Sequence, residues 1–304
     1  MPEIIDYILR KLSQPVSTLR ALRLRFDMAW LSLRNRFGWW PVATGKPGPV
    51  VSLTTYGMRI HAVSLAIESI ARGYTKPSRL ILWLDDPALF ANPPKALLRL
   101  KRRGLEMRFC KNYGPHKKYY PFVESQKVFT DPLVTADDDV IYPRSWLAGL
   151  LAAHAEFPNC VNCYRARVMT LRDGKIAPYR EWPLCESADP SYSTVATGVS
   201  GVIYPSALLK ELKAAGTDFE SRCPKADDLW LHVRAIRSGF QVRQMQQEPI
   251  HFPMIPGTQA TSLWAENCAR DDGNDRQLTV TYEASDLELL ESNTLESHLV
   301  AVHA

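Results

Sequence analysis

The chain has 304 residues, of which 46% are hydrophobic and 23% charged, and its net charge is +5. This composition is typical of a globular protein with one large domain or two coupled domains, and it argues against a disordered or fibrous chain. The charge is too small to indicate a nucleic-acid partner, and no apolar run reaches the roughly 18 residues of a membrane span.

Residues 1–44 form a basic segment that differs in pattern from the rest of the chain. Residues 1–40 carry seven Lys and Arg against three acids. Apolar residues recur there at three- and four-residue steps, which predicts one amphipathic helix. This apolar row contains Leu19, Leu22, Phe26, Trp30, Leu33 and Phe37. A basic amphipathic helix followed by Trp39 and Trp40 is typical of a membrane interface, and the alternative is a helix packed on the main domain.

Strands and helices alternate along residues 50–109. Short apolar runs predict buried strands, and the segments between them have the apolar spacing and the Gly or Pro boundaries of helices. The strands are expected at 50–55, 79–84 and 105–109, and the helices at 59–71 and 93–103. This order is typical of a parallel sheet with right-handed crossovers.

The most informative stretch is residues 133–143, in which an apolar lead-in is followed by three aspartates. The lead-in predicts a buried strand, and ligands of open α/β sheets bind beyond the carboxyl ends of strands. Adjacent buried carboxylates repel one another unless a cation lies among them, and Mg²⁺ or Mn²⁺ prefers such oxygen ligands. Residues two apart in an extended strand share a face, so Asp137 and Asp139 are expected together and Asp138 away from them. The alternative is a solvated acidic turn.

From residue 159 the pattern indicates antiparallel strands. Asp173-Gly174 is a hairpin signal. Strands are expected at 160–170, 175–179, 197–205 and 240–245, and helices at 119–129, 143–155, 206–215 and 227–238. The acidic tail beyond Tyr282 predicts a helix or disorder.

The six cysteines lack the spacing of a disulfide framework, which favours a reducing compartment. Cys160 and Cys163 form one CxxC without a second pair, so zinc or redox chemistry is not favoured there. With no visible signal peptide, we expect a cytoplasmic protein.

Seven stretches together resemble a glycosyltransferase of the GT-A fold, closest to the bacterial family-2-like enzymes that build surface polysaccharides. They are VVSLTTYGMRI at 50–60, KPSRLILWL at 76–84, GPHKKYYP at 114–121, TADDDVIYP at 135–143, GVSGVIYP at 198–205, ADDLWL at 226–231 and NDRQL at 274–278. The resemblance covers roughly residues 50–277 and implies a Rossmann-like mixed α/β sheet flanked by helices. We therefore expect an N-terminal helical segment at 1–44, a catalytic domain at 45–282 and a tail at 283–304.

The resemblance implies a nucleotide-sugar donor, a saccharide or lipid-linked acceptor, and Mn²⁺ or Mg²⁺. Metal ligands are expected at Asp139, Asp137 and His251, and further donor contacts at Thr54, Tyr56, Lys117, Lys118, Asp138 and Gly201. The acid pair Asp227 and Asp228 matches the one that supplies the base in inverting members, which usually read Glu-Asp. Each position also has a structural alternative, such as a strand residue, a solvated lysine, a sheet bulge or a helix N-terminus.

Two other functions fit less well. A sugar nucleotidyltransferase also uses a Rossmann-like sheet and Mg²⁺, but no glycine-rich phosphate loop follows the first strand. A non-catalytic carbohydrate-binding protein would not need Asp137, Asp139 and Asp228. The expected location is the cytoplasm, with peripheral contact at the inner face of the cell membrane.

Overall fold

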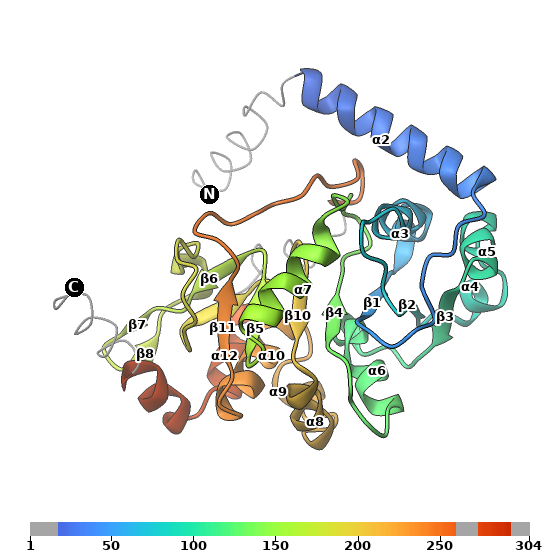
Figure 1. The fold of residues 1–304 in the computed structure, drawn as a ribbon. Helices are drawn as coiled ribbons and strands as arrows, with labels where there is room; N and C mark the ends of the chain where they lie inside the picture. Colours follow the sequence, from blue (N-terminus) through green and yellow to red (C-terminus); the bar gives the residue numbers. More distant parts are fainter. Residues whose placement is uncertain (1–17, 260–272, 293–304) are drawn as a thin grey trace.

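The computed structural model describes residues 18–259 and 273–292, and its centre is a mixed seven-stranded sheet between helices (Figure 1). The strand order is β11-β5-β10-β4-β1-β2-β3. These strands are β1 Val50–Thr54, β2 Arg79–Leu84, β3 Leu105–Phe109, β4 Leu133–Thr135, β5 Cys160–Cys163, β10 Val202–Tyr204 and β11 Gln241–Gln244. Only β10 runs antiparallel to its neighbours β4 and β5. The predicted α/β fold with a Rossmann-like mixed sheet is confirmed.

Two small ribbons and thirteen helical elements complete the described structure. The ribbons pair β6 Ala166–Val168 with β9 Thr194–Ala196, and β7 Leu171–Arg172 with β8 Lys175–Ile176. The helical elements are α2 Thr18–Phe37, η1 Gly57–His61, α3 Val63–Ala71, α4 Pro87–Ala91, α5 Lys95–Arg102, η2 Gly114–Lys118, α6 Tyr120–Ser125, α7 Trp146–Glu156, η3 Tyr179–Glu181, α8 Ser206–Ala214, α9 Phe219–Arg222, α10 Asp227–Arg237 and α12 Gly273–Thr281. Residues 284–292 are also helical, and the rest of the predicted tail lies outside the described residues.

The core has two halves because strand side chains point alternately to opposite faces. On one face Val50, Ile81 and Leu133 pack with α6, α8 and α10. On the other face Val51 and Val134 pack with α3, α5 and α7. Burial on both faces explains the nearly continuous apolar runs of these strands.

Several predicted elements are shorter than expected. The strand predicted at 160–170 is interrupted at 164–165 and ends at Val168, and the one predicted at 175–179 ends at Ile176. The strand predicted at 197–205 begins only at Val202, because Gly198, Ser200 and Gly201 have φ values of 73°, 72° and 106°, which are incompatible with a strand. The helix predicted at 119–129 ends at Ser125. The Asp173-Gly174 hairpin is confirmed between β7 and β8.

A buried carboxylate attaches α2 to the main domain. Glu68 of α3 is fully buried, and it pairs with Arg103 and, at 3.2 Å, with Arg34 of α2. Asn35 of α2 donates a further hydrogen bond to Glu68 at 3.2 Å. Two guanidinium groups and an amide thus replace the water that this carboxylate loses on folding.

Glu68→Gln should destabilise the protein by about 3–5 kcal/mol, because it leaves two buried arginines without a counter-charge. Urea unfolding monitored by circular dichroism measures the loss in the free energy of unfolding. Glu106→Gln is the matched control, because Glu106 also pairs with two arginines, Arg79 and Arg108, yet its side chain is 29% exposed. Glu106→Gln should lower the free energy of unfolding by about 1 kcal/mol or less. Equal losses in the two variants would contradict the role of Glu68 as a buried counter-charge.

Candidate active site

Polar side chains gather where three parallel strands end. Thr55 and Tyr56 follow β1, Asp85 follows β2, and Asp137 to Asp139 follow β4. The strands end nearly level, because Thr54 pairs with Trp83 and Ser52 pairs with Thr135. In such sheets this edge is where ligands bind.

The three aspartates do not alternate as expected. Asp137 accepts a 2.5 Å bond from Nζ of Lys118, whereas Asp138 and Asp139 share Nη1 of Arg59 at 3.1 and 3.3 Å. The prediction that Asp138 points away from the other two was therefore wrong. The reason is local, since β4 ends at Thr135 and residues 138–139 form a turn instead of an extended strand.

This acidic turn holds more negative charge than Arg59 offsets. Burial raises the pKa of Asp139 to about 6, and repulsion from Asp137 adds to this effect. Burial also raises the pKa of Asp138, although Arg59 opposes the shift. A cation in addition to Arg59 and Lys118 would relieve the remaining repulsion, and carboxylate oxygens are the donors that Mg²⁺ and Mn²⁺ prefer.

Sequence reasoning did not single out three residues that hold this turn. Arg59 lies against the Tyr56 ring, 5.3 Å from its centre, and bonds to both carboxylates. Thr55 donates to Asp138 at 2.6 Å, and Nε2 of Gln259 donates to Asp139 at 2.7 Å. Thr55 and Arg59 lie within the quoted VVSLTTYGMRI stretch, but nothing in the sequence identifies their partners.

The buried His116 holds in place the loop of residues 114–118, which carries Lys117 and Lys118 and is called the lysine loop below. Nε2 of His116 donates to the Cys223 carbonyl at 2.7 Å, so Nδ1 accepts from the Tyr119 hydroxyl at 3.0 Å. The ring stacks on Phe219 at 4.0 Å, and burial lowers its pKa to about 4. His116 is therefore neutral, and it connects the lysine loop to the segment just before α10.

Lys118 links the acidic turn to the second acid pair. Burial lowers the pKa of Lys118, but Asp137 and Asp227 outweigh burial and raise it overall. The adjacent Lys117 pairs instead with Asp85 at 2.5 Å. The structure thus brings together the predicted residues Lys118, Asp137 and Asp227.

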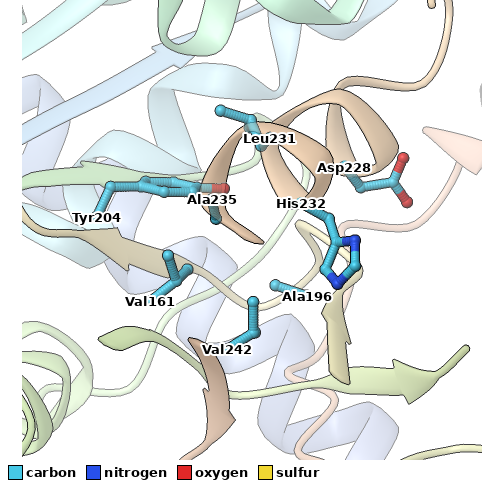
Figure 2. A pocket seen from close by; sticks show the side chains of 8 residues that line it. All are labelled: Val161, Ala196, Tyr204, Asp228, Leu231, His232, Ala235 and Val242. Atoms are coloured by element: carbon cyan, nitrogen blue, oxygen red, sulfur yellow. The ribbon is translucent and has the colours of Figure 1, made fainter. Parts of the chain in front are cut away.

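Asp228 occupies a different environment from Asp227. Burial and then repulsion from Asp227 raise the pKa of Asp228 to about 7. Its carboxylate accepts a 3.4 Å bond from the Tyr179 hydroxyl. Asp228 also lines an internal cavity beside His232 and Tyr204 (Figure 2). This cavity measures about 10 Å³, which is the space of one water molecule and not of a substrate.

Three other predicted site residues have structural partners. Thr54 donates to the Trp83 carbonyl at 3.0 Å, and Gly201 faces Trp146, whose Nε1 would lie 2.6 Å from an added Cβ. Close packing and a positive φ therefore suffice to explain glycine at 201. His251 is exposed, with Nε2 3.4 Å from the Met254 sulfur. Their donor or metal roles stay predictions.

The described residues contain no group of three His, Cys, Asp or Glu side chains arranged to hold a metal ion. His251 belongs to the segment that reaches the acidic turn, because Ile255, four residues after it, donates its N–H to the Asp139 carbonyl at 2.7 Å. The five cysteines within the described part of the chain are free and buried. Among the described helices, none is long and apolar enough to cross a bilayer.

Asp139→Asn should stabilise the metal-free protein at pH 8 by about 3 kcal/mol. The folded-state pKa of about 6 lies above the ordinary aspartate pKa of 3.8, so ionisation of Asp139 costs folding free energy that is fully present above pH 6. At pH 4 the wild-type carboxyl is already protonated, and the gain should vanish. Urea unfolding in EDTA at both pH values measures this, with the exposed turn variant Asp173→Asn as control. A loss of stability at pH 8 would show that Arg59 outweighs burial.

No protein-family model and no curated protein matches the chain. Solved structures that resemble it include GalNAc-T7 with UDP, GalNAc and Mn²⁺ (TM-score 0.45, 9% identity, 64% of this chain and 41% of that one). Others are S. aureus TarS 1–349 (0.37, 15%, 60% and 56%) and a CMP:2-keto-3-deoxy-manno-octonic acid synthetase complexed with CTP (0.39, 14%, 65% and 88%). The first two are GT-A glycosyltransferases, the class that the sequence motifs resemble. Because all three TM-scores are below 0.5, these similarities carry no argument about activity.

Proposed function

We propose that this protein is a metal-dependent glycosyltransferase that moves a sugar, with inversion, from a nucleoside-diphosphate sugar to a saccharide or lipid-linked acceptor. The observation that carries this proposal is the position of Lys118. It pairs with Asp137 at the end of β4 and interacts with Asp227 at the start of α10. An acidic turn suited to a cation and an acid pair suited to a base therefore both act electrostatically on one ammonium group.

The acidic turn is the proposed donor end of the site. Asp139 and Asp137 would hold Mn²⁺ or Mg²⁺, with His251 as a further ligand. Such ions commonly use one or two carboxylates together with substrate phosphates, so a complete cage of protein ligands is not required. The bound metal would offset the negative charge that develops on the departing nucleoside diphosphate.

The chain's own residues would orient the rest of the donor. Lys118 forms a short ion pair with Asp137, and a diphosphate at this position would compete for its ammonium group. Lys117 lies beside it on η2. Thr54 ends β1 and Tyr56 follows it, where a nucleobase can lie along the sheet edge, and Asp138 holds Arg59 in place.

Asp228 is the proposed general base. An acceptor hydroxyl is a poor nucleophile until a base takes its proton during attack on the anomeric carbon. A pKa of about 7 suits a group that must accept a proton near neutral pH. Asp227 lies toward Lys118 and would orient the acceptor.

The remaining alternatives are a sugar nucleotidyltransferase and a non-catalytic carbohydrate-binding protein. Incubation with nucleotide sugars tests for transfer or hydrolysis, and incubation with CTP or UTP and a sugar phosphate tests for nucleotidyl transfer. Absence of both activities, with sugar binding retained, would favour a binding protein. The predicted location at the inner face of a cell membrane belongs to this proposal.

Asp139→Asn should abolish Mn²⁺-dependent binding of nucleoside diphosphates, because it removes a charged oxygen ligand. Calorimetric titration of UDP, GDP and CMP, with and without Mn²⁺, measures the effect. Asp173→Asn serves as the matched control, since it makes the same chemical change in an exposed turn. Wild-type affinity in Asp139→Asn under saturating Mn²⁺ would exclude the metal role.

Asp228→Asn should slow transfer by about 10²–10⁴-fold with nearly unchanged donor affinity. In the wild type, kcat/KM should rise with pH up to about 7 and then level off, because the base must lose its proton. Asp227→Asn should cost less and mainly raise the acceptor KM. NMR should find a β-linked product from an α-linked donor. Retained anomeric configuration would refute a base at Asp228 even if the variant were inactive.

A further inference from the structure

The helix α2 packs on the protein by one face and presents its apolar row on the opposite face. Leu31 is buried in a cluster with Ala62, Ile141 and Ile255, and the partly buried Leu24 and Met28 pack against this cluster. The apolar row predicted from the sequence is exposed instead, and it consists of Leu19, Leu22, Phe26, Trp30, Leu33 and Phe37. Because helix positions advance by roughly 100° per residue, this row is centred almost opposite the buried cluster. Figure 1 shows α2 along one edge of the molecule.

The exposure of this row is large. Phe26 is 71% exposed, Phe37 68% and Trp39 77%, and Trp39 stacks on Trp40 just beyond the helix. The sequence therefore supplies two apolar faces, of which the fold uses the smaller one. An outward row of this size marks a surface that another phase or molecule covers.

Basic side chains lie on both sides of the exposed row. At helical spacing Arg20 and Arg23 fall on one side of it, and Arg25 and Arg36 fall on the other. The only acid of α2 is Asp27, which pairs with Arg72 of the main domain at 3.1 Å. The exposed face of α2 thus combines apolar side chains with positive charge, and the one carboxylate on its flank, Asp27, is already paired with Arg72.

This combination matches an anionic lipid surface better than a protein. Interfacial helices place an apolar row at the boundary between headgroups and acyl chains, with basic residues reaching the headgroups on both sides. A Trp side chain has an apolar ring and a polar N–H, and such a boundary accommodates both. A second copy of α2 would instead bring arginines against arginines, with no unpaired carboxylate on this face to separate them.

We propose that α2 lies flat on an anionic lipid bilayer, with its exposed apolar row in the headgroup boundary. Its buried face contacts segments that form the acidic turn, since Ile141 follows Asp139 closely and the N–H of Ile255 donates to the Asp139 carbonyl. Docking therefore holds this end of the sheet near the membrane surface. Lipid docking is independent of the proposed function; the corollary that the acceptor is lipid-linked rests on glycosyl transfer.

The full-length chain should sediment with vesicles of phosphatidylcholine and phosphatidylglycerol, and only weakly with phosphatidylcholine alone. The double variant Phe26→Ser, Leu33→Ser should bind the anionic vesicles at least about tenfold more weakly, because two exposed apolar side chains are lost. Val128→Ser is the matched control. Val128 is also 71% exposed but follows α6, on the side of the molecule away from α2 in Figure 1, and its loss should change nothing.

Charge is tested separately. Arg23→Gln, Arg36→Gln should weaken binding to anionic vesicles and reduce its dependence on salt, because fewer cations face the lipid. Mn²⁺-dependent nucleotide binding should be unchanged in both double variants. Failure of lipid docking is therefore distinguishable from failure of the proposed function, and the unfolding midpoint verifies folding.

Four results would overturn the proposal. The full-length chain would not sediment with anionic vesicles at low salt, or it would sediment equally well after Phe26→Ser, Leu33→Ser. Alternatively, analytical ultracentrifugation would show a dimer that this variant dissociates, without vesicle binding, which would assign the face to a second copy. Vesicle binding only after removal of residues 1–17 would assign the face to that segment.

Discussion

The ammonium group of Lys118 lies among carboxylates that come from two distant parts of the chain. Asp137 follows the central strand β4, and Asp227 begins α10. Several partly buried carboxylates in one region would repel one another strongly without a cation between them. Burial raises the pKa values of Asp139 and Asp228, and the part of this repulsion that is not offset raises them further.

The surrounding fold keeps Lys118 at this position. His116, two residues earlier, is buried and neutral, and it bonds to the carbonyl of Cys223, four residues before Asp227. The loop that carries the lysine and the start of α10 are therefore joined by a hydrogen bond that does not change charge at neutral pH. A rigid support of this kind is what a site needs to hold charged groups at fixed distances.

At the acidic turn, Arg59 compensates carboxylate charge as Lys118 does beside Asp137. It offsets some of the charge of Asp138 and Asp139 and stacks on Tyr56 at the end of β1. The edge that carries these residues is also the one against which α2 packs. The N-terminal helix thus belongs structurally to the main domain through Glu68, while its outer face remains available to a different environment.

Four features follow from local sequence pattern. They are the alternation of strands and helices, the hairpin at Asp173-Gly174, the acidic turn beyond a buried strand, and the amphipathic helix at 18–37. Such features depend on residues close together in the chain, so sequence reasoning reaches them. The sequence also singled out Lys118, Asp137 and Asp227, but it did not indicate that they meet.

Only the tertiary structure decided which side chains pair with one another in the candidate site. Arg59 and Asp138 are 79 positions apart, and Lys118 and Asp137 are 19 apart. It also decided that Asp138 shares Arg59 with Asp139, and that the larger apolar row of α2 faces outward while Leu24, Met28 and Leu31 pack inward. Periodicity shows that a helix has an apolar face, but which face is buried depends on the shape and charge of the surface it meets, and here the buried Glu68 selects the side that carries Arg34 and Asn35.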